Sequence, residues 1–73
     1  MRKVKVARMM SGLKQCDVAE VLGVSRQMYN KKENGNSSFS LEQALIVAKL
    51  FGTTTEELFY EEVVNSKLTN EQA

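Results

Sequence analysis

Four polar side chains follow one another closely in the middle of this sequence, and their types suit contact with nucleic acid. They are Arg26, Gln27, Asn30 and Lys31. Arginine can bond to guanine O6 and N7, and glutamine or asparagine to adenine N6 and N7, from the major groove. Lysine more often meets a phosphate. On a helix, the second pair lies one turn after the first and shares its face. The alternative is four solvated residues on a surface helix.

The element that would present these side chains is a corner between two short helices. Gly23 tolerates the positive φ that ends a helix in the left-handed conformation, and Ser25 is a favoured N-cap for the next helix. Ala19 is small enough to lie where the two helices cross. Four apolar residues are expected to face inward around it: Val18, Leu22, Val24 and Tyr29. This pattern is the helix-turn-helix, whose second helix enters the major groove of DNA.

Helical spacing and helix-end signals predict three helices in the first half of the chain and no convincing strand. The first covers about residues 2–11 and is ended by Gly12. Its apolar positions are Val4, Ala7 and Met10, or the stem of Arg8 in place of the last. The second contains Ala19 and stops at Gly23. The third follows Ser25 and stops at Asn34 and Gly35.

Two capping boxes predict a fourth and a fifth helix. Ser40 with Gln43 begins the fourth helix, Gly52 ends it, and Thr54 with Glu57 begins the fifth. The fourth helix carries a long apolar stripe, and the short fifth helix adds two apolar residues: Leu41, Ala44, Leu45, Ala48 and Phe51, then Leu58 and Phe59. Five short helices with tight connections therefore predict a compact all-α domain.

Length and composition limit what this domain can be. The chain has 73 residues, one cysteine, no histidine and no tryptophan. We expect one domain over residues 1–64, with a polar, disordered tail over residues 65–73. No intrachain disulfide and no Cys/His zinc site can form, and a lone cysteine fits the reducing cytoplasm. No apolar run is long enough to cross a membrane. The absence of a nucleophile–base pair argues against an enzyme, and nothing implies a cofactor.

Charge is distributed unevenly along the chain, although the net charge is only +1. The first 32 residues contain eight lysines and arginines and two carboxylates, whereas the remainder contains two lysines and seven glutamates. This asymmetry favours one surface that binds a polyanion and another that does not. The alternative is a chance gradient of solvated charge.

Two stretches resemble the Cro/CI-type (XRE-like) repressors, which have the lambda-repressor-like fold. They are "QCDVAEVLGVSRQMYNKKENG" and "SLEQALIVAKLFGTTTEELF", and the likeness covers about residues 4–59. It implies a five-helix domain whose helix-turn-helix is formed by helices 2 and 3, double-stranded DNA as partner, and usually a dimer. It also implies that Gln15 contacts a phosphate and that Arg8 pairs with Glu33.

Two positions depart from the family pattern. Lys32 stands where the third helix normally has an apolar residue, so either its stem reaches past the core edge to a phosphate or the helix sits unusually. Lys14 replaces the usual Ser or Thr cap before Gln15.

Further contacts with DNA are expected from residues that flank the third helix. Ser25 is expected to cap its helix first and touch a phosphate second. Asn34 and Asn36 lie in the loop after the third helix and are expected to contact the DNA backbone, with solvated loop polarity as the alternative.

A homodimer interface is predicted in the C-terminal half, unless the same residues only complete the monomer core: Ile46, Leu50, Tyr60, Val63 and Val64.

The sequence therefore predicts a cytoplasmic, prokaryotic or phage regulator of transcription. We expect it to bind operator DNA as a homodimer and to repress by occlusion. The alternative is a protein-interaction module, such as an antitoxin or an adaptor, in which DNA binding is secondary. Its partner would be a toxin or an antirepressor bound to the acidic C-terminal half. Only the DNA-reading function requires Arg26 and Gln27.

Overall fold

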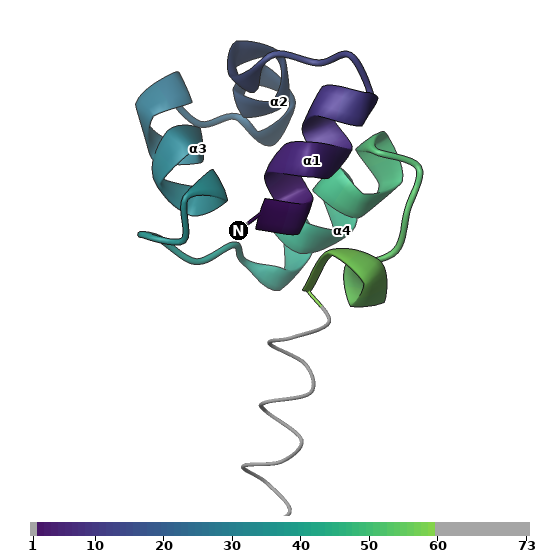
Figure 1. The fold of residues 1–73 in the computed structure, drawn as a ribbon. Helices are drawn as coiled ribbons and strands as arrows, with labels where there is room; N and C mark the ends of the chain where they lie inside the picture. The colour runs from purple at the N-terminus through teal and green to yellow at the C-terminus, as the bar shows by residue number, and fades with distance from the viewer. Residues whose placement is uncertain (1, 60–73) are drawn as a thin grey trace, which may run out of the picture.

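A computed structural model describes residues 2–59, and helices make up most of this part of the chain. Four helices follow in order, and residues 55–59 are helical again: α1 (Arg2–Met10), α2 (Gln15–Leu22), α3 (Arg26–Glu33) and α4 (Leu41–Leu50) (Figure 1). No strand occurs among the described residues. The predicted all-α architecture is confirmed. The predicted tail over residues 65–73 lies outside the described residues.

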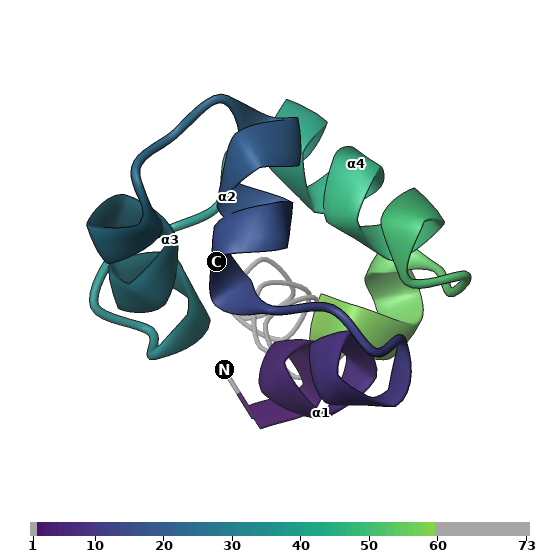
Figure 2. The same cartoon turned by 90° about the horizontal axis from the view of Figure 1, so that it is seen from above.

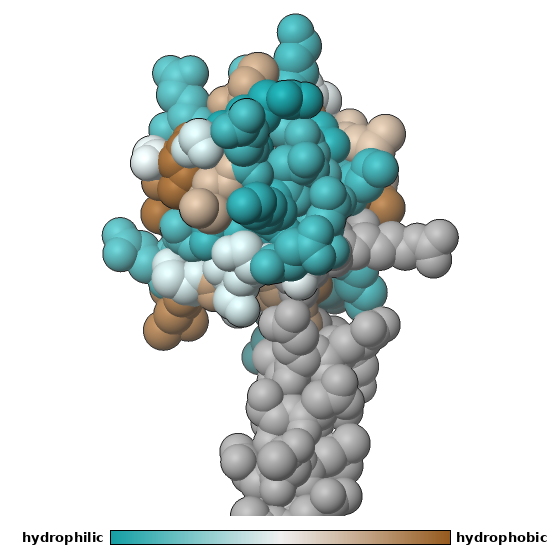
Figure 3. Space-filling model, turned by 90° about the vertical axis from the view of Figure 1, so that its left-hand side faces the viewer, coloured by the Kyte–Doolittle hydropathy of each residue, from teal (hydrophilic) through white to brown (hydrophobic). Residues whose placement is uncertain are grey.

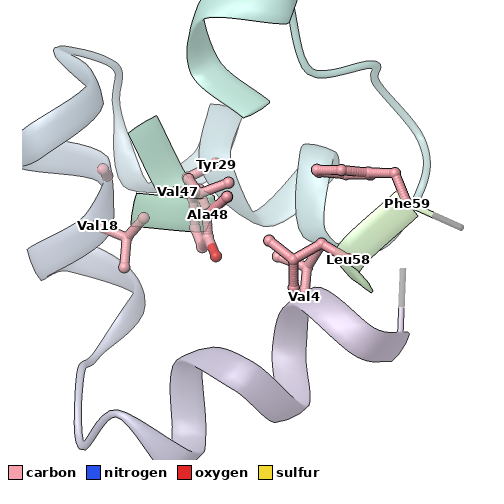
Figure 4. Close-up of a cluster of buried hydrophobic side chains, with 8 residues drawn as sticks. Val4, Val18, Tyr29, Val47, Ala48, Leu58 and Phe59 are labelled. Carbon is pink, nitrogen blue, oxygen red and sulfur yellow. The ribbon is translucent and has the colours of Figure 1, made fainter. Parts of the chain in front are cut away.

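The helices surround one small core to which every helical segment contributes. Its completely or almost completely buried apolar residues are Val4, Val18, Ala19, Tyr29, Val47, Ala48, Leu58 and Phe59 (Figure 4). Phe39, between α3 and α4, links two of them through edge-to-face contacts, with ring centroids 6.3 Å from Tyr29 and 5.6 Å from Phe59. Such pairs stabilise a core beyond their buried area. Phe39 thereby connects α3 to the helical segment over residues 55–59.

The apolar stripe predicted for α4 is only partly right. Ala48 is buried as expected, but Leu41 and Leu45 are 77% and 55% exposed. Val47, which the prediction left out, is completely buried. Successive residues of a helix point about 100° apart. A modest rotation of α4 about its axis therefore decides whether Leu45 or Val47 faces the core.

On α1 the inward position after Val4 and Ala7 is taken by Arg8 rather than by Met10. Val4 is buried and Ala7 half-buried, whereas Met10 is 84% exposed. The helix ends one residue earlier than predicted, and Gly12 follows it with a φ of 72°. The end of α1 thus directs a guanidinium, not a thioether, toward the interior.

The corner between α2 and α3 is built from the expected residues. Gly23 has a φ of 71°, and its N–H and that of Val24 donate to the carbonyls of Glu20 and Ala19 at 3.1 and 3.0 Å. This is the double hydrogen bond of a left-handed helix end. Ala19 is buried at the crossing. In both views α3 lies at the outer edge of the molecule with α2 beside it (Figures 1 and 2).

The capping box of Ser40 and Gln43 forms completely, whereas that of Thr54 and Glu57 forms only the bond to the Thr54 hydroxyl. Ser40 Oγ accepts from Gln43 N–H at 3.1 Å, and Gln43 Oε1 accepts from Ser40 N–H at 3.0 Å. Thr54 Oγ1 accepts from Glu57 N–H at 3.1 Å. These bonds satisfy donors that the first turn of a helix leaves unpaired, and they fix where α4 and the segment over residues 55–59 begin.

Candidate nucleic-acid interface

The first turn of α3 carries two long polar side chains into solvent. Ser25 Oγ accepts a hydrogen bond from Met28 N–H at 3.1 Å and so caps the helix. Arg26 and Gln27 follow directly, and both are exposed. Tyr29 is the residue of this turn that faces the core. Because the buried face of α3 is elsewhere, the donors of Arg26 and Gln27 are available to a ligand.

At its other end, α3 is fastened to α1 by a buried ion pair. Arg8 Nε and Nη2 donate to the two carboxylate oxygens of Glu33 at 2.8 and 3.2 Å, and Nη1 donates to the Leu13 carbonyl at 2.8 Å. The Glu33 side chain is 1% exposed and that of Arg8 11%. This is the pair that the family resemblance implies. A bidentate arrangement of this kind fixes orientation as well as distance.

Burial and hydrogen bonding shift the pKa values of Glu33 and Arg8 in opposite directions. Burial alone would raise the pKa of Glu33, but the hydrogen bonds from Arg8 and Gln15 and the Arg8 charge hold that pKa below its usual value. The bond to Glu33 raises the pKa of Arg8 in spite of burial. Burial, with the Glu33 carboxylate adding to it, raises the pKa of Tyr29. Near neutral pH the site therefore contains an ionised pair beside a neutral phenol.

Gln15, the first residue of α2, joins this pair to the exposed face of α3. Its Nε2 donates to Glu33 Oε1 at 3.2 Å and to Asn30 Oδ1 at 3.3 Å. Asn30 Oδ1 also accepts from Asn34 Nδ2 at 2.9 Å. A line of hydrogen bonds thus runs from Arg8 inside the domain to two exposed asparagines.

The sequence prediction gave Gln15 a different role, that of a phosphate ligand. Both N–H groups of its side chain are occupied within the domain, so a phosphate contact by that amide requires exchange of one of these bonds. A phosphate contact at Gln15 remains a prediction.

The neighbouring lysines Lys31 and Lys32 differ in what their ammonium groups meet. Lys31 is exposed. Lys32 is only 8% exposed; its Nζ donates to the Ser38 carbonyl at 2.7 Å and lies 5.9 Å from the centre of the Phe39 ring. The stem of Lys32 therefore occupies the apolar position, and its charge is held by the loop after α3. A contact of Lys32 with a phosphate would require its ammonium to leave the Ser38 carbonyl, and it remains a prediction.

Before α2, Lys14 has no side chain that can accept a hydrogen bond as the usual Ser or Thr does. Instead Asp17 Oδ2 accepts from the Lys14 N–H at 2.8 Å. This bond supplies the other half of a capping box, so the start of α2 is fixed without the family's usual residue.

The face that carries α3 is largely hydrophilic, with apolar surface mainly at its edges (Figure 3). Arg26 and Lys31 give this face positive charge, and Glu33 adds no exposed negative charge because it is buried and paired with Arg8. A hydrophilic, cationic helix face at the edge of the molecule suits a polyanion.

Comparison with known proteins agrees with this geometry. The helix-turn-helix family pattern matches residues 4–58. The chain is also 42% identical over 57 residues to an uncharacterized HTH-type transcriptional regulator of Methanocaldococcus jannaschii, covering 78% of this chain and 86% of that protein. The chain belongs to the Cro/CI-type helix-turn-helix family. No solved structure matches it.

The Cro/CI-type assignment accounts for α2 and α3 as the helix-turn-helix, and it lets the other predicted residues be located. Asn34 caps the end of α3 and bonds to Asn30. The Asn36 side chain is exposed in the loop that follows, and its N–H donates to the Lys31 carbonyl at 2.8 Å. All eight residues predicted to contact DNA lie on α3, at its two ends, in the loop that follows it or at the start of α2.

The residues predicted for a dimer interface do not form one set in the described part of this Cro/CI-type domain. Ile46 and Leu50 are half-buried, and Leu50 packs against the core. Tyr60, Val63 and Val64 lie outside the described residues. The most exposed apolar side chains of α4 are Leu41 and Leu45.

Sequence reasoning missed the bonds of Gln15 to Asn30 and Glu33. The available signal was the family position of Gln15 beside the Arg8–Glu33 pair, but the side-chain geometry was needed to reveal the link.

Among the described residues, no helix is both long and apolar enough to span a membrane.

Proposed function

We propose that this protein binds operator DNA as a homodimer, with α3 in the major groove, and represses transcription by occluding the promoter. The observation that carries the proposal is the exposure of Arg26 and Gln27 in the first turn of α3, the part of a recognition helix that reaches base edges. The similarity to a transcriptional regulator of Methanocaldococcus jannaschii supports it.

In this proposal the two residues read bases and their surroundings hold the DNA backbone. Arg26 suits guanine and Gln27 suits adenine, each through two hydrogen bonds. Lys31 contributes charge toward a phosphate. Ser25 Oγ accepts a bond from within the helix, which leaves its O–H free to donate to a phosphate oxygen. Asn36 serves as a further backbone contact from the loop.

A dimer is the proposed assembly because a domain of this size gains stability by covering apolar surface. Leu41 and Leu45 lie one turn apart on α4 and are its most exposed apolar side chains, so a partner that covers this side of α4 would bury both. Ile46 and Leu50 lie on another side of the helix. Two copies related by a twofold axis would place their α3 helices about 34 Å apart, one turn of DNA.

Selection from a random duplex library tests the proposal. We expect the selected sequence to be an inverted repeat with half-site centres separated by about 10 base pairs. In sedimentation experiments, Leu45→Glu should weaken self-association, and the exposed control Glu20→Ala should not. A library that yields no sequence would contradict operator binding, and a selected single half-site bound by a monomer would contradict the dimer.

The second candidate function is a protein-interaction module, such as an antitoxin or an adaptor. The exposed Leu41 and Leu45, one turn apart on α4, favour it because adjacent exposed apolar side chains often mark a protein contact. A toxin or antirepressor bound there would leave α3 free but would compete with the proposed dimer for Leu41 and Leu45. The two functions separate when Arg26 and Gln27 are replaced, since only DNA reading requires them.

A further inference from the structure

The hydrogen bonds that lead from Arg8 to Asn30 have only one possible direction. A guanidinium can only donate, so the Glu33 carboxylate accepts, and an ionised carboxylate can do nothing else. Gln15 must therefore turn its Nε2, not its Oε1, toward Glu33. The same Nε2 contacts Asn30, which must present its oxygen there.

Asn30 receives a second bond that agrees with this direction. Asn34 Nδ2 donates to the same Oδ1 at 2.9 Å, while Gln15 Nε2 lies 3.3 Å from it. A carbonyl oxygen has two lone pairs, so both acceptor positions of Asn30 are occupied. Its Nδ2 has no hydrogen-bond partner in the described part of the chain, and the residue is exposed on α3. Only donors remain for a ligand.

We infer that Asn30 acts on DNA as a donor only, locked in that orientation by Gln15 and Asn34. Its ligand is a hydrogen-bond acceptor: a phosphate oxygen, or an acceptor on the edge of guanine or thymine. The bidentate contact of asparagine with adenine is excluded because it needs Oδ1 to accept from N6. This inference rests on the proposed function and assigns Asn30 a narrower role than its residue type allows.

The lock itself is tested without DNA. In a ¹H–¹⁵N spectrum of the free protein, Asn30→Ala should shift the side-chain amide resonances of both Gln15 and Asn34. Glu20→Ala, an exposed substitution on α2, should leave these resonances in place. If Asn30→Ala moves neither amide, the lock does not exist and the inference is overturned.

The role on DNA is tested with the duplex that the wild-type protein selects. Asn30→Ala should weaken binding roughly tenfold, as expected for one hydrogen bond to a charged acceptor. Asn30→Asp should weaken it at least as much, because its carboxylate can accept from Gln15 and Asn34 but cannot donate. Thermal unfolding of both variants shows whether the domain remains folded, and Glu20→Ala should bind as the wild type does.

Single-base substitutions in that duplex distinguish the two sources of the acceptor. If it is a phosphate, Asn30→Ala lowers affinity for every substituted duplex by the same factor. If it is a base, the wild type prefers guanine or thymine at one position of each half-site, and Asn30→Ala loses that preference alone.

Two results on DNA would overturn the inference while the proposed function stands. One is an adenine preference that depends on Asn30. The other is a folded Asn30→Ala protein that binds as tightly as the wild type. A wild-type protein that selects no sequence would instead contradict the proposed function, and the DNA part of the inference with it.

Discussion

The guanidinium of Arg8 and the carboxylate of Glu33 are 25 residues apart in sequence and bonded at 2.8 Å. They join the last turn of α1 to the last turn of α3. Gln15 bonds to the same carboxylate from the start of α2, so one buried charge holds all three helices. The orientation of the proposed recognition helix therefore depends on an ion pair as well as on apolar packing.

Removing one partner of this pair should destabilise the protein severely. Arg8→Ala leaves the Glu33 carboxylate, 1% exposed, without its counter-charge, and we expect the free energy of unfolding to fall by about 3–5 kcal/mol. The double variant Arg8→Met/Glu33→Leu should recover most of that loss. Urea denaturation measures both, with Glu20→Ala, expected within about 0.5 kcal/mol of wild type, as the control. Equal stability of Arg8→Ala and wild type would refute this role.

Acid should destabilise the protein by protonating the Glu33 carboxylate. The pKa of Glu33 is lower in the folded protein than its ordinary value of 4.5, so the folded state binds fewer protons there than the unfolded state. The resulting stability is present above about pH 4.5 and is lost as the pH falls through the lower folded-state pKa. Denaturation from pH 7 to pH 3 should show this decrease, and Arg8→Met/Glu33→Leu should show a smaller one. An unchanged pH dependence in the double variant would count against it.

Replacing Gly23 by alanine should destabilise the corner between α2 and α3. Its φ is 71° and a Cβ would meet nothing within 4 Å, so the cost of Gly23→Ala lies in the backbone alone. We expect a loss of about 1–2 kcal/mol. Gly23→Asn should lose less, because asparagine tolerates the left-handed conformation. Thermal unfolding compares the two variants; an alanine variant as stable as wild type would mean that the corner relaxes out of this conformation.

Replacing Lys31 should weaken DNA binding through a lost phosphate contact, whereas replacing its neighbour Lys32 should not. Lys31→Met should lower affinity for all duplexes alike and reduce the slope of log affinity against log salt by about 1, as expected for loss of one phosphate contact. Lys32→Met should leave that slope unchanged because its ammonium is bonded to the Ser38 carbonyl. Titrations at several salt concentrations decide this. A reduced slope for Lys32→Met would show that Lys32 leaves the loop and meets DNA.

Local signals were enough to predict most of the fold. Gly12 and Gly23 mark helix ends because only a residue without Cβ adopts their φ cheaply. Ser25 and Ser40 mark helix starts because their hydroxyls satisfy the free N–H groups of a first turn. These rules act over a few residues and can be read directly from the sequence. The family resemblance then supplied the long-range Arg8–Glu33 contact.

The features that the sequence did not predict depend on the rotation of a helix about its own axis and on side-chain geometry. On α4 the sequence permits two apolar faces, and the direction of approach of the neighbouring helices decides that Val47 is buried and Leu45 exposed. A lysine at position 32 suggested that its ammonium reaches a phosphate, but in the structure this ammonium donates to the Ser38 carbonyl. The bonds of Gln15 to Asn30 arise from two helices meeting, which no local pattern encodes.

The central claim is that Arg26 and Gln27 read bases, and one comparison tests it most directly. The wild-type protein and Arg26→Ala/Gln27→Ala would each be titrated with the selected duplex and with a scrambled duplex, at two salt concentrations. We predict that the wild type prefers the selected duplex by about a thousandfold or more. The double variant should lose at least about thirtyfold of that preference, and both proteins should bind the scrambled duplex weakly and more weakly still at high salt. Equal preference for the selected duplex by the two proteins would contradict the account.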